Sequence, residues 1–217
     1  MADALEGIEH IRAIAWDLDG VLNRDPNRWQ DLLAREYDLD TGSLNRMVFA
    51  QPRKVLCGEV DILDRLEAFA ELPEAAGLGA EEILEAWFEA GHNPDDDLLR
   101  LMELLTAAGL VQVLATNNEA RRIRYLMLEG GWSERVDGVF ASGEMGAMKP
   151  EAKFFETIEK ALNMAPAEIL LVDDKPRNNE AADKRGWLTW DYAADVPAQG
   201  AQALARALMP LLLRAQA

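Results

Sequence analysis

The run Ile11-Arg12-Ala13-Ile14-Ala15-Trp16 stops abruptly at Asp17-Leu18-Asp19-Gly20, where the chain changes from apolar to acidic residues. A short apolar run that ends in a polar turn is typical of a buried strand. The carboxylates of Asp17 and Asp19 then lie just beyond the carboxyl end of that strand. The segment therefore predicts an acidic site at one edge of a sheet.

Other segments of the chain repeat this form. Residues 110–115 form an apolar run that ends in Thr-Asn, and residues 168–172 form one that ends in Asp-Asp. Weaker strands are expected at 138–141 and 187–190. Each strong strand is thus followed directly by polar side chains.

Segments of helical periodicity separate these strands, at residues 95–108, 119–129 and 151–162. Alternating strands and helices predict an α/β fold, with a Rossmann-like three-layer core whose central parallel sheet is covered on both faces. Ligands of such sheets bind beyond the carboxyl ends of the strands. All the polar clusters named above are expected at that edge.

Residues 27–90 interrupt the alternation and contain only helical periods. Turn-rich segments border this block on both sides, as is common where two units join. We therefore expect a helical cap of residues 23–91, inserted after the first strand of a core made of residues 1–22 and 92–217. A further amphipathic helix is expected within 198–217.

The composition excludes several classes of protein. The net charge is −17 and no Lys/Arg cluster offers a basic groove, so nucleic acids and acidic membranes are not expected partners. No apolar run approaches the roughly 18 residues of a membrane span, and the acidic N-terminus lacks the basic region of a signal peptide. Cys57 is the only cysteine and there are two histidines, which disfavours a disulfide or a zinc site and fits the cytoplasm. The oligomeric state cannot be inferred from the sequence.

Two carboxylates spaced as Asp17 and Asp19 are suited to two different tasks. One can attack a phosphorus atom in line, and the other can manage the proton of the leaving group. The plainer alternative is a polar turn, or a fragment of a calcium loop. A calcium loop lies between two helices, whereas a strand precedes this pair, so calcium is disfavoured.

Each of the later polar clusters can likewise have either a catalytic or a purely structural role. Thr116 and the N–H groups at Asn117 can hold a phosphate oxygen, or they can merely cap the next helix. Lys149 can bind phosphate as a point charge, or it can be a surface lysine before a proline. Asp173 and Asp174 repel each other unless a cation such as Mg²⁺ lies near them, although they too could cap a helix.

Taken together, the four clusters carry a resemblance to a known family. In chain order they read D-x-D-G at 17–20, T-N at 116–117, K-P at 149–150 and D-D at 173–174. This order resembles the four-motif signature of haloacid dehalogenase-like hydrolases, over nearly the whole chain. The long gap before the second motif is similar to members with a helical cap, and segments such as 142–150 are most similar to capped phosphatases of small sugar phosphates.

The resemblance implies roles for individual residues. Asp17 would be the nucleophile that forms an aspartyl-phosphate, and Asp19 would protonate the leaving alcohol and then activate water. Thr116 and the N–H of Asn117 would hold the phosphoryl group, and Lys149 would stabilise both Asp17 and the phosphate. Mg²⁺ is the implied cofactor. Its ligands would be Asp17, the backbone carbonyl of Asp19, and Asp174 with Asp173.

We therefore expect a Mg²⁺-dependent phosphatase acting on a small phosphorylated metabolite, such as a sugar phosphate. Dehalogenases of the family lack the second acid of the first motif, so Asp19 argues against dehalogenation. Phosphosugar mutases usually have an acid-Thr-x-x-x-His pattern early in the cap, and residues 23–29 contain no histidine. A member that binds a ligand or partner without turnover is the non-enzymatic alternative. The candidates for substrate contacts in the cap are Arg24, Arg28, Trp29, Arg53 and Glu59.

Overall fold

A computed structural model describes residues 5, 7–24 and 28–214. Its centre is a sheet of five parallel strands in the order β3-β2-β1-β4-β5. The strands are β1 (Ala13–Trp16), β2 (Val111–Thr116), β3 (Gly138–Ala141), β4 (Ile169–Asp173) and β5 (Leu188–Asp191). The predicted parallel sheet is confirmed, and the observed strands begin within two residues of the predicted ones.

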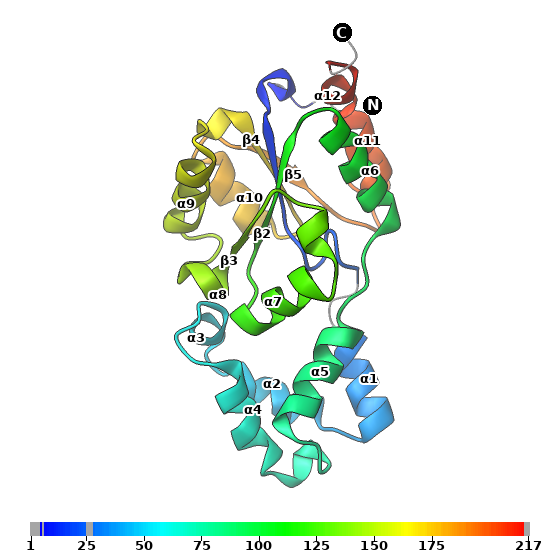
Figure 1. The fold of residues 1–217 in the computed structure, drawn as a ribbon, viewed down its shortest axis with the longest axis vertical. Coiled ribbons are helices and arrows are strands. Elements are labelled where there is room, and N and C mark those ends of the chain that lie inside the picture. Colours follow the sequence, from blue (N-terminus) through cyan, green and yellow to red (C-terminus); the bar gives the residue numbers. More distant parts are fainter. Residues whose placement is uncertain (1–4, 6, 25–27, 215–217) are drawn as a thin grey trace.

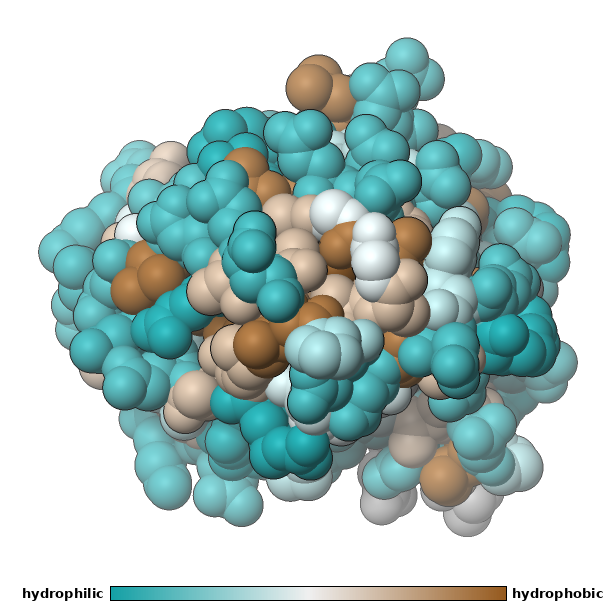
Figure 2. Space-filling model, turned by 90° about the horizontal axis from the view of Figure 1, so that it is seen from below, coloured by the Kyte–Doolittle hydropathy of each residue, from teal (hydrophilic) through white to brown (hydrophobic). Residues whose placement is uncertain are grey.

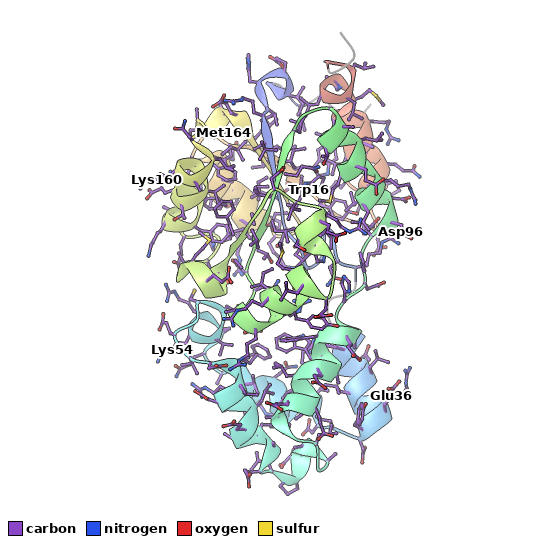
Figure 3. All side chains as sticks on the ribbon, viewed as in Figure 1. Trp16, Glu36, Lys54, Asp96, Lys160 and Met164 are labelled. Carbon is purple, nitrogen blue, oxygen red and sulfur yellow. The ribbon has the colours of Figure 1, made fainter. Side chains whose placement is uncertain are left out.

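Helices cover both faces of the sheet, which confirms the three-layer α/β core. In β1, Ile14 and Trp16 pack on one side, while Ala13 and Ala15 pack on the other. The first side is covered by α6 (Asp96–Ala107), α7 (Ala120–Leu128), α11 (Ala201–Ala207) and α12 (Met209–Arg214), and the second by α9 (Ala152–Leu162) and α10 (Pro176–Asp183). Figure 3 shows Trp16 in the middle of this core, with charged residues such as Lys160 and Asp96 at its periphery.

The strand register brings the polar clusters together. Trp16 pairs with Leu114 on one side and with Val172 on the other. The residues that follow these three positions therefore leave the sheet at the same edge. Consistent with this, the backbone N–H of Asp17 donates to the carbonyl of Val172 at 2.9 Å.

Residues between β1 and α6 form a helical unit with a hydrophobic cluster of its own. It consists of α1 (Arg28–Tyr37), α2 (Thr41–Val48), α3 (Pro52–Leu56), α4 (Ile62–Ala70) and α5 (Ala80–Ala90). Trp29, Phe69 and Trp87 belong to this cluster. The unit faces the carboxyl ends of the strands (Figure 1), and its far end has apolar residues surrounded by hydrophilic ones (Figure 2).

The two segments that connect this unit to the core are bound to each other. The Asn23 side chain donates to the carbonyl of Gly91 at 2.6 Å and accepts from the N–H of Asn93 at 2.6 Å. The Arg24 N–H donates to the carbonyl of Asn93 at 2.8 Å, and the Arg24 side chain pairs with buried Asp95 at 2.5 Å. The chain thus enters and leaves the helical unit through one hydrogen-bonded crossing.

The expected single helix within 198–217 is wrong in one respect, because two helices occupy this segment. Helix α11 ends at Ala207 and α12 begins at Met209. Pro210 explains the break, since a proline inside a continuous helix lacks the N–H for one hydrogen bond and clashes with the carbonyl four residues earlier. In the first turn of α12, the same proline is tolerated.

Short elements complete the described part of the chain. They are α8 (Ser142–Met145) and the 3-10 turns Ile8–His10, Pro73–Ala75, Trp132–Glu134 and Pro166–Glu168. None of the described helices combines the length and apolar character that crossing a membrane requires.

Candidate active site

Asp17 lies at the end of β1 and is almost completely buried, with 7% of its surface exposed. One of its carboxylate oxygens, Oδ1, accepts the N–H of Leu18 at 2.8 Å and faces Lys149 Nζ at 3.0 Å. Burial raises the pKa of Asp17 to about 7; the charge of Lys149 opposes this shift, and nearby Asp173 and Asp174 add to it. The carboxylate therefore needs positive charge close by to stay ionised.

Lys149 supplies part of that charge from a fully buried position. Its Nζ donates to Asp173 Oδ2 at 2.5 Å and lies 3.0 Å from Asp17 Oδ1. Burial opposes the charged form, but the two carboxylates outweigh it and raise the pKa of Lys149. Asn117 fixes the backbone of Lys149, because its side chain donates to the carbonyl and accepts from the N–H, both at 2.9 Å.

Asp17, Asp173 and Asp174 each offer an oxygen to one cluster, and these oxygens lie within 4.8 Å of one another. The Asp173 carboxylate is already occupied, since Lys149 Nζ, the N–H of Lys175 and the Asn178 amide all donate to it. By contrast, Asp174 Oδ1 is buried and has no hydrogen-bond partner.

A hard cation such as Mg²⁺ fits this cluster. Magnesium prefers oxygen ligands and usually takes one or two carboxylates plus water and substrate phosphate. Lys149 and Lys175, whose Nζ bonds Asp174 Oδ2 at 2.5 Å, bring two positive charges to three carboxylates, which leaves the cluster one charge short. A buried carboxylate oxygen without a donor costs free energy, so the partner of Asp174 Oδ1 is best supplied by a bound cation.

Gly20 leaves the space in which Asp174 lies. Its φ is +93°, which disfavours other residues, and a Cβ atom here would lie 2.6 Å from Asp174 Oδ2. Gly20 is therefore required in the first motif because any larger residue would clash with Asp174 of the fourth motif.

Thr116 ends β2 and is buried beside the same edge. Its Oγ1 accepts from the Asn118 side-chain amide at 2.8 Å, and the same amide donates to Asp19 Oδ2 at 3.0 Å. The structure thus brings the second motif against the first. A phosphate-holding role for Thr116 and Asn117 stays a prediction.

Asp19 is bound from three directions. Both terminal nitrogens of Arg122 donate to its carboxylate, Nη2 to Oδ1 at 2.8 Å and Nη1 to Oδ2. Asn23 donates to Oδ1 at 2.7 Å, and Asn118 donates to Oδ2. Burial alone would raise the pKa of Asp19, but the charge of Arg122 and these hydrogen bonds together lower it below its usual value.

The sequence analysis missed Arg122. The side chain lies on α7 with 3% of its surface exposed, next to Ile123 on the buried part of that helix. A signal existed, because Arg122 lies four residues before Leu126 and so on the apolar face of the helix predicted at 119–129. An arginine in such a stripe indicates a buried partner, but the sequence does not reveal that the partner is Asp19.

The predicted cap candidates have other partners in the structure. Arg24 pairs with Asp95, and Trp29 packs on Trp87 with ring centroids 5.2 Å apart. Arg53 is paired with both Glu59 and Glu151. The side chain of Arg28 lies outside the described part of the structure.

Two surface ion pairs join the helical unit to the core. Arg53 bonds Glu151 at 2.8 Å, and Arg121 bonds Asp61 through two nitrogens at 2.7 and 2.6 Å. In addition, the Ser142 hydroxyl donates to the carbonyl of Leu56 at 2.6 Å. The unit is therefore seated on the candidate site.

The sequence is similar to those of known proteins. The family model of haloacid dehalogenase-like hydrolases matches residues 11–184. The sesquiterpene phosphatase astK of Aspergillus oryzae (strain ATCC 42149 / RIB 40) is 30% identical over 182 residues, which cover 81% of this chain and 86% of that protein.

Solved structures show the same fold. The enzyme bt-2542 of Bacteroides thetaiotaomicron, in complex with magnesium and inorganic phosphate, superposes with a TM-score of 0.68 at 20% identity, over 86% of this chain and 96% of that one. The L-2-haloacid dehalogenase of Xanthobacter autotrophicus, with chloropropionic acid covalently bound, superposes with a TM-score of 0.63 at 22% identity, over 92% of this chain and 83% of that one.

Proposed function

Because this chain belongs to the haloacid dehalogenase-like hydrolases, we propose that it hydrolyses phosphomonoesters in a Mg²⁺-dependent reaction through a phosphoryl group held on Asp17. One observation carries the proposal. Lys149 lies between Asp17 and Asp173, beside an Asp174 oxygen that lacks a partner. Positive charge next to a buried carboxylate suits the transfer of a phosphoryl group, which depends mainly on positioning and charge stabilisation.

The proposed reaction has two steps. In the first, an oxygen of Asp17 attacks phosphorus and the bond from phosphorus to the ester oxygen breaks. Asp19, which must carry a proton at this step although Arg122 favours its ionised form, gives that proton to the departing alcohol. In the second, a water oxygen attacks the same phosphorus, its proton passes to Asp19, and the bond to Asp17 breaks. The products are an alcohol and inorganic phosphate, and both acids return to their starting states.

Asp17 and Asp174 are the best candidates to hold Mg²⁺ directly, with the backbone carbonyl of Asp19 as a further predicted ligand. Asp173 is better suited to anchor Lys149, because three donors already occupy its carboxylate. When bound, the ion supplies positive charge beside the phosphoryl oxygens. Thr116 and the N–H of Asn117 are proposed to hold the remaining oxygens of that group.

Three rival activities are less well supported. Dehalogenases share the fold, but displacing a halide needs no proton donor, and here Asp19 is held in place by three side chains. A mutase is disfavoured by the lack of a histidine in residues 23–29. A member that only binds a ligand would not be expected to keep all four motifs.

Two classes of substrate remain candidates. The segments around the later motifs favour a sugar phosphate, as the sequence predicts. The alternative class is phosphate esters of apolar alcohols. The named activity of the related sesquiterpene phosphatase supports this second class. We favour phosphate esters of apolar alcohols.

The test is the release of inorganic phosphate from a panel of sugar phosphates and isoprenoid alkyl phosphates, with and without Mg²⁺. Asp17→Asn is the control protein, and 2-chloropropionate is included as a dehalogenase substrate. Turnover that requires both Mg²⁺ and Asp17 supports the proposal, and the preferred ester identifies the class. Chloride release without phosphate release would refute it.

A further inference from the structure

The contact between Arg122 and Asp19 joins two side chains that are 103 residues apart in the sequence. We propose that Arg122 is a positioning residue, which orients the Asp19 carboxylate for its proton transfers and makes that orientation depend on the seated helical unit. The proposal rests on the proposed function, since it assigns Arg122 a part in the work of Asp19.

The two terminal nitrogens of the guanidinium have little capacity left for a substrate, and Nε is buried without a partner. Nη1 donates to Asp19 and to Asn118 Oδ1 at 2.6 Å, and Nη2 donates to Asp19 and to the carbonyl of Gly91 at 3.3 Å. With 3% of the side chain exposed, these bonds engage both terminal nitrogens inside the protein. Arg122 is therefore expected to act through Asp19 and not as a phosphate-binding cation.

The same guanidinium touches the helical unit at two points. Its Cζ lies 5.7 Å from the centroid of the Trp87 ring, at the end of α5. The Gly91 carbonyl that accepts from Nη2 also accepts from Asn23, in the crossing between the two connecting segments. A shift of α5 or of this crossing therefore changes the contacts that hold the fork of Arg122 against Asp19.

A planar fork suits this task better than a point charge. Two parallel N–H···O bonds fix the plane of a carboxylate as well as its distance, and lysine cannot reproduce this geometry. Proton transfer by a correctly placed side chain is worth roughly 10²–10⁴-fold in rate, so losing the orientation of Asp19 has a large expected effect.

The experiment compares two esters that differ in their need for a proton donor. 4-Nitrophenyl phosphate releases a phenolate that departs without a proton, whereas 2-phenylethyl phosphate releases an alkoxide that needs one. The variants are Arg122→Met and Arg122→Lys. Arg124→Met is the matched control, because it removes an exposed arginine from the same helix.

With Arg122→Met we expect kcat for the phenylethyl ester to fall about 100-fold with little change in KM. For the nitrophenyl ester, the rate of the first nitrophenolate release should stay within about threefold of the wild-type rate. The burst should be near one equivalent of nitrophenolate per enzyme, because only the later attack by water needs Asp19. Arg122→Lys should behave in the same way, since it keeps the charge but lacks the fork. Arg124→Met should match wild type on both esters.

A double-mutant cycle with Asp19→Asn tests whether Arg122 acts through Asp19. In the Asp19→Asn background, Arg122→Met is expected to change the rate by less than about twofold, because the group on which it acts is gone. If the rate losses of Arg122→Met and Asp19→Asn instead multiply in the double variant, the proposal is overturned. The proposal is also overturned if Arg122→Met slows the nitrophenolate burst as much as it slows steady turnover. If Arg122→Met fails to fold, Arg122→Lys decides by the same criteria.

Failure of this inference is distinguishable from failure of the proposed function. If wild type hydrolyses neither ester, the proposed function fails and the inference falls with it. If wild type is active and Asp17→Asn is not, the function stands. If the nitrophenolate burst of the Arg122 variants then slows as much as turnover of the phenylethyl ester, the positioning role alone is contradicted.

Discussion

The side chain of Asn117 pairs with the backbone of Lys149 in both directions, donating to its carbonyl and accepting from its N–H at 2.9 Å each. These two bonds tie the segment after β2 to the segment that carries the buried lysine. In this arrangement Lys149 Nζ already lies within bonding distance of the Asp17 and Asp173 carboxylates.

We predict that Asn117→Ala lowers both stability and activity. The substitution leaves the N–H and carbonyl of Lys149 without their protein partner, at about 1–3 kcal/mol for each group that stays buried and unsatisfied. Urea unfolding measures the loss of stability, and kcat is expected to fall at least tenfold with the displaced Nζ. Normal kcat in the folded variant would show that Lys149 is positioned by other contacts.

Gly20→Ala should weaken Mg²⁺ binding, because the added methyl group occupies the place of Asp174 Oδ2. Disturbing the support of a metal ligand typically costs 10–100-fold in affinity, and we expect about that change in the Mg²⁺ concentration needed for half-maximal activity.

Gly77→Ala is the matched control for Gly20→Ala. Gly77 also has a positive φ, +82°, but a Cβ there meets nothing within 4 Å. Gly77→Ala therefore shows the effect of backbone strain on Mg²⁺ dependence when no clash accompanies it. Equal Mg²⁺ dependence in the two variants would contradict the role of Gly20.

Removal of Mg²⁺ should distinguish the role of Asp174 from that of Asp173. Because a ligand that binds only the folded state stabilises it, Mg²⁺ is expected to raise the Tm of wild type and chelator to lower it again. Asp174→Asn should abolish this shift. The measurement is thermal unfolding with and without Mg²⁺, and an undiminished shift in Asp174→Asn would rule out Asp174 as a direct ligand.

Asp173→Asn should act differently, because it removes one partner of the buried Lys149 charge. Breaking a buried ion pair in this way costs about 3–5 kcal/mol. We expect this loss in urea unfolding even without Mg²⁺. A variant as stable as wild type would show that Asp17 alone suffices to hold Lys149.

His92 should make stability depend on pH. Burial, with smaller contributions from the charges of Arg122 and Arg135, lowers the pKa of His92, and its Nε2 is buried without a partner. The folded state therefore prefers the neutral imidazole. Its stabilising contribution is complete above the unfolded pKa of about 6.5 and is lost as the pH falls through the lower folded value.

The measurement is urea unfolding of wild type and His92→Gln from neutral pH down to about pH 5, a range chosen around the unfolded pKa. Wild type should lose more stability than the variant over this range. Other titrating groups contribute to both proteins, so the difference isolates His92. Parallel profiles would mean that His92 has the same pKa in both states.

Much of the fold could be predicted because its signals are local. The apolar runs before Asp17, Thr116 and Asp173 identify central strands, and a parallel sheet necessarily gathers their ends. The helical block at 27–90 was predicted, but the position of α3 inside it was not, since five residues are too few for a periodic pattern. The break at Pro210 could have been predicted from the proline alone.

The side chains that contact Asp19 could not be predicted from local sequence patterns. Arg122 and Asn118 reach Asp19 only because β1 and β2 are neighbours in register, about a hundred residues apart in the chain. Local patterns identify the acid but not the side chains that face it. The unpartnered oxygen of Asp174 likewise emerges only from the packed structure.

The crossing at Asn23 makes the helical unit an exchangeable module. Chain segments that enter and leave at one hydrogen-bonded point can be spliced there without altering the register of any strand in the sheet. A chimera that carries a foreign helical unit between Arg24 and Gly91 would inherit the catalytic edge intact. The foreign unit would have to supply an aromatic ring to rest on Arg122 and partners for Arg121, Glu151 and Ser142 of the core.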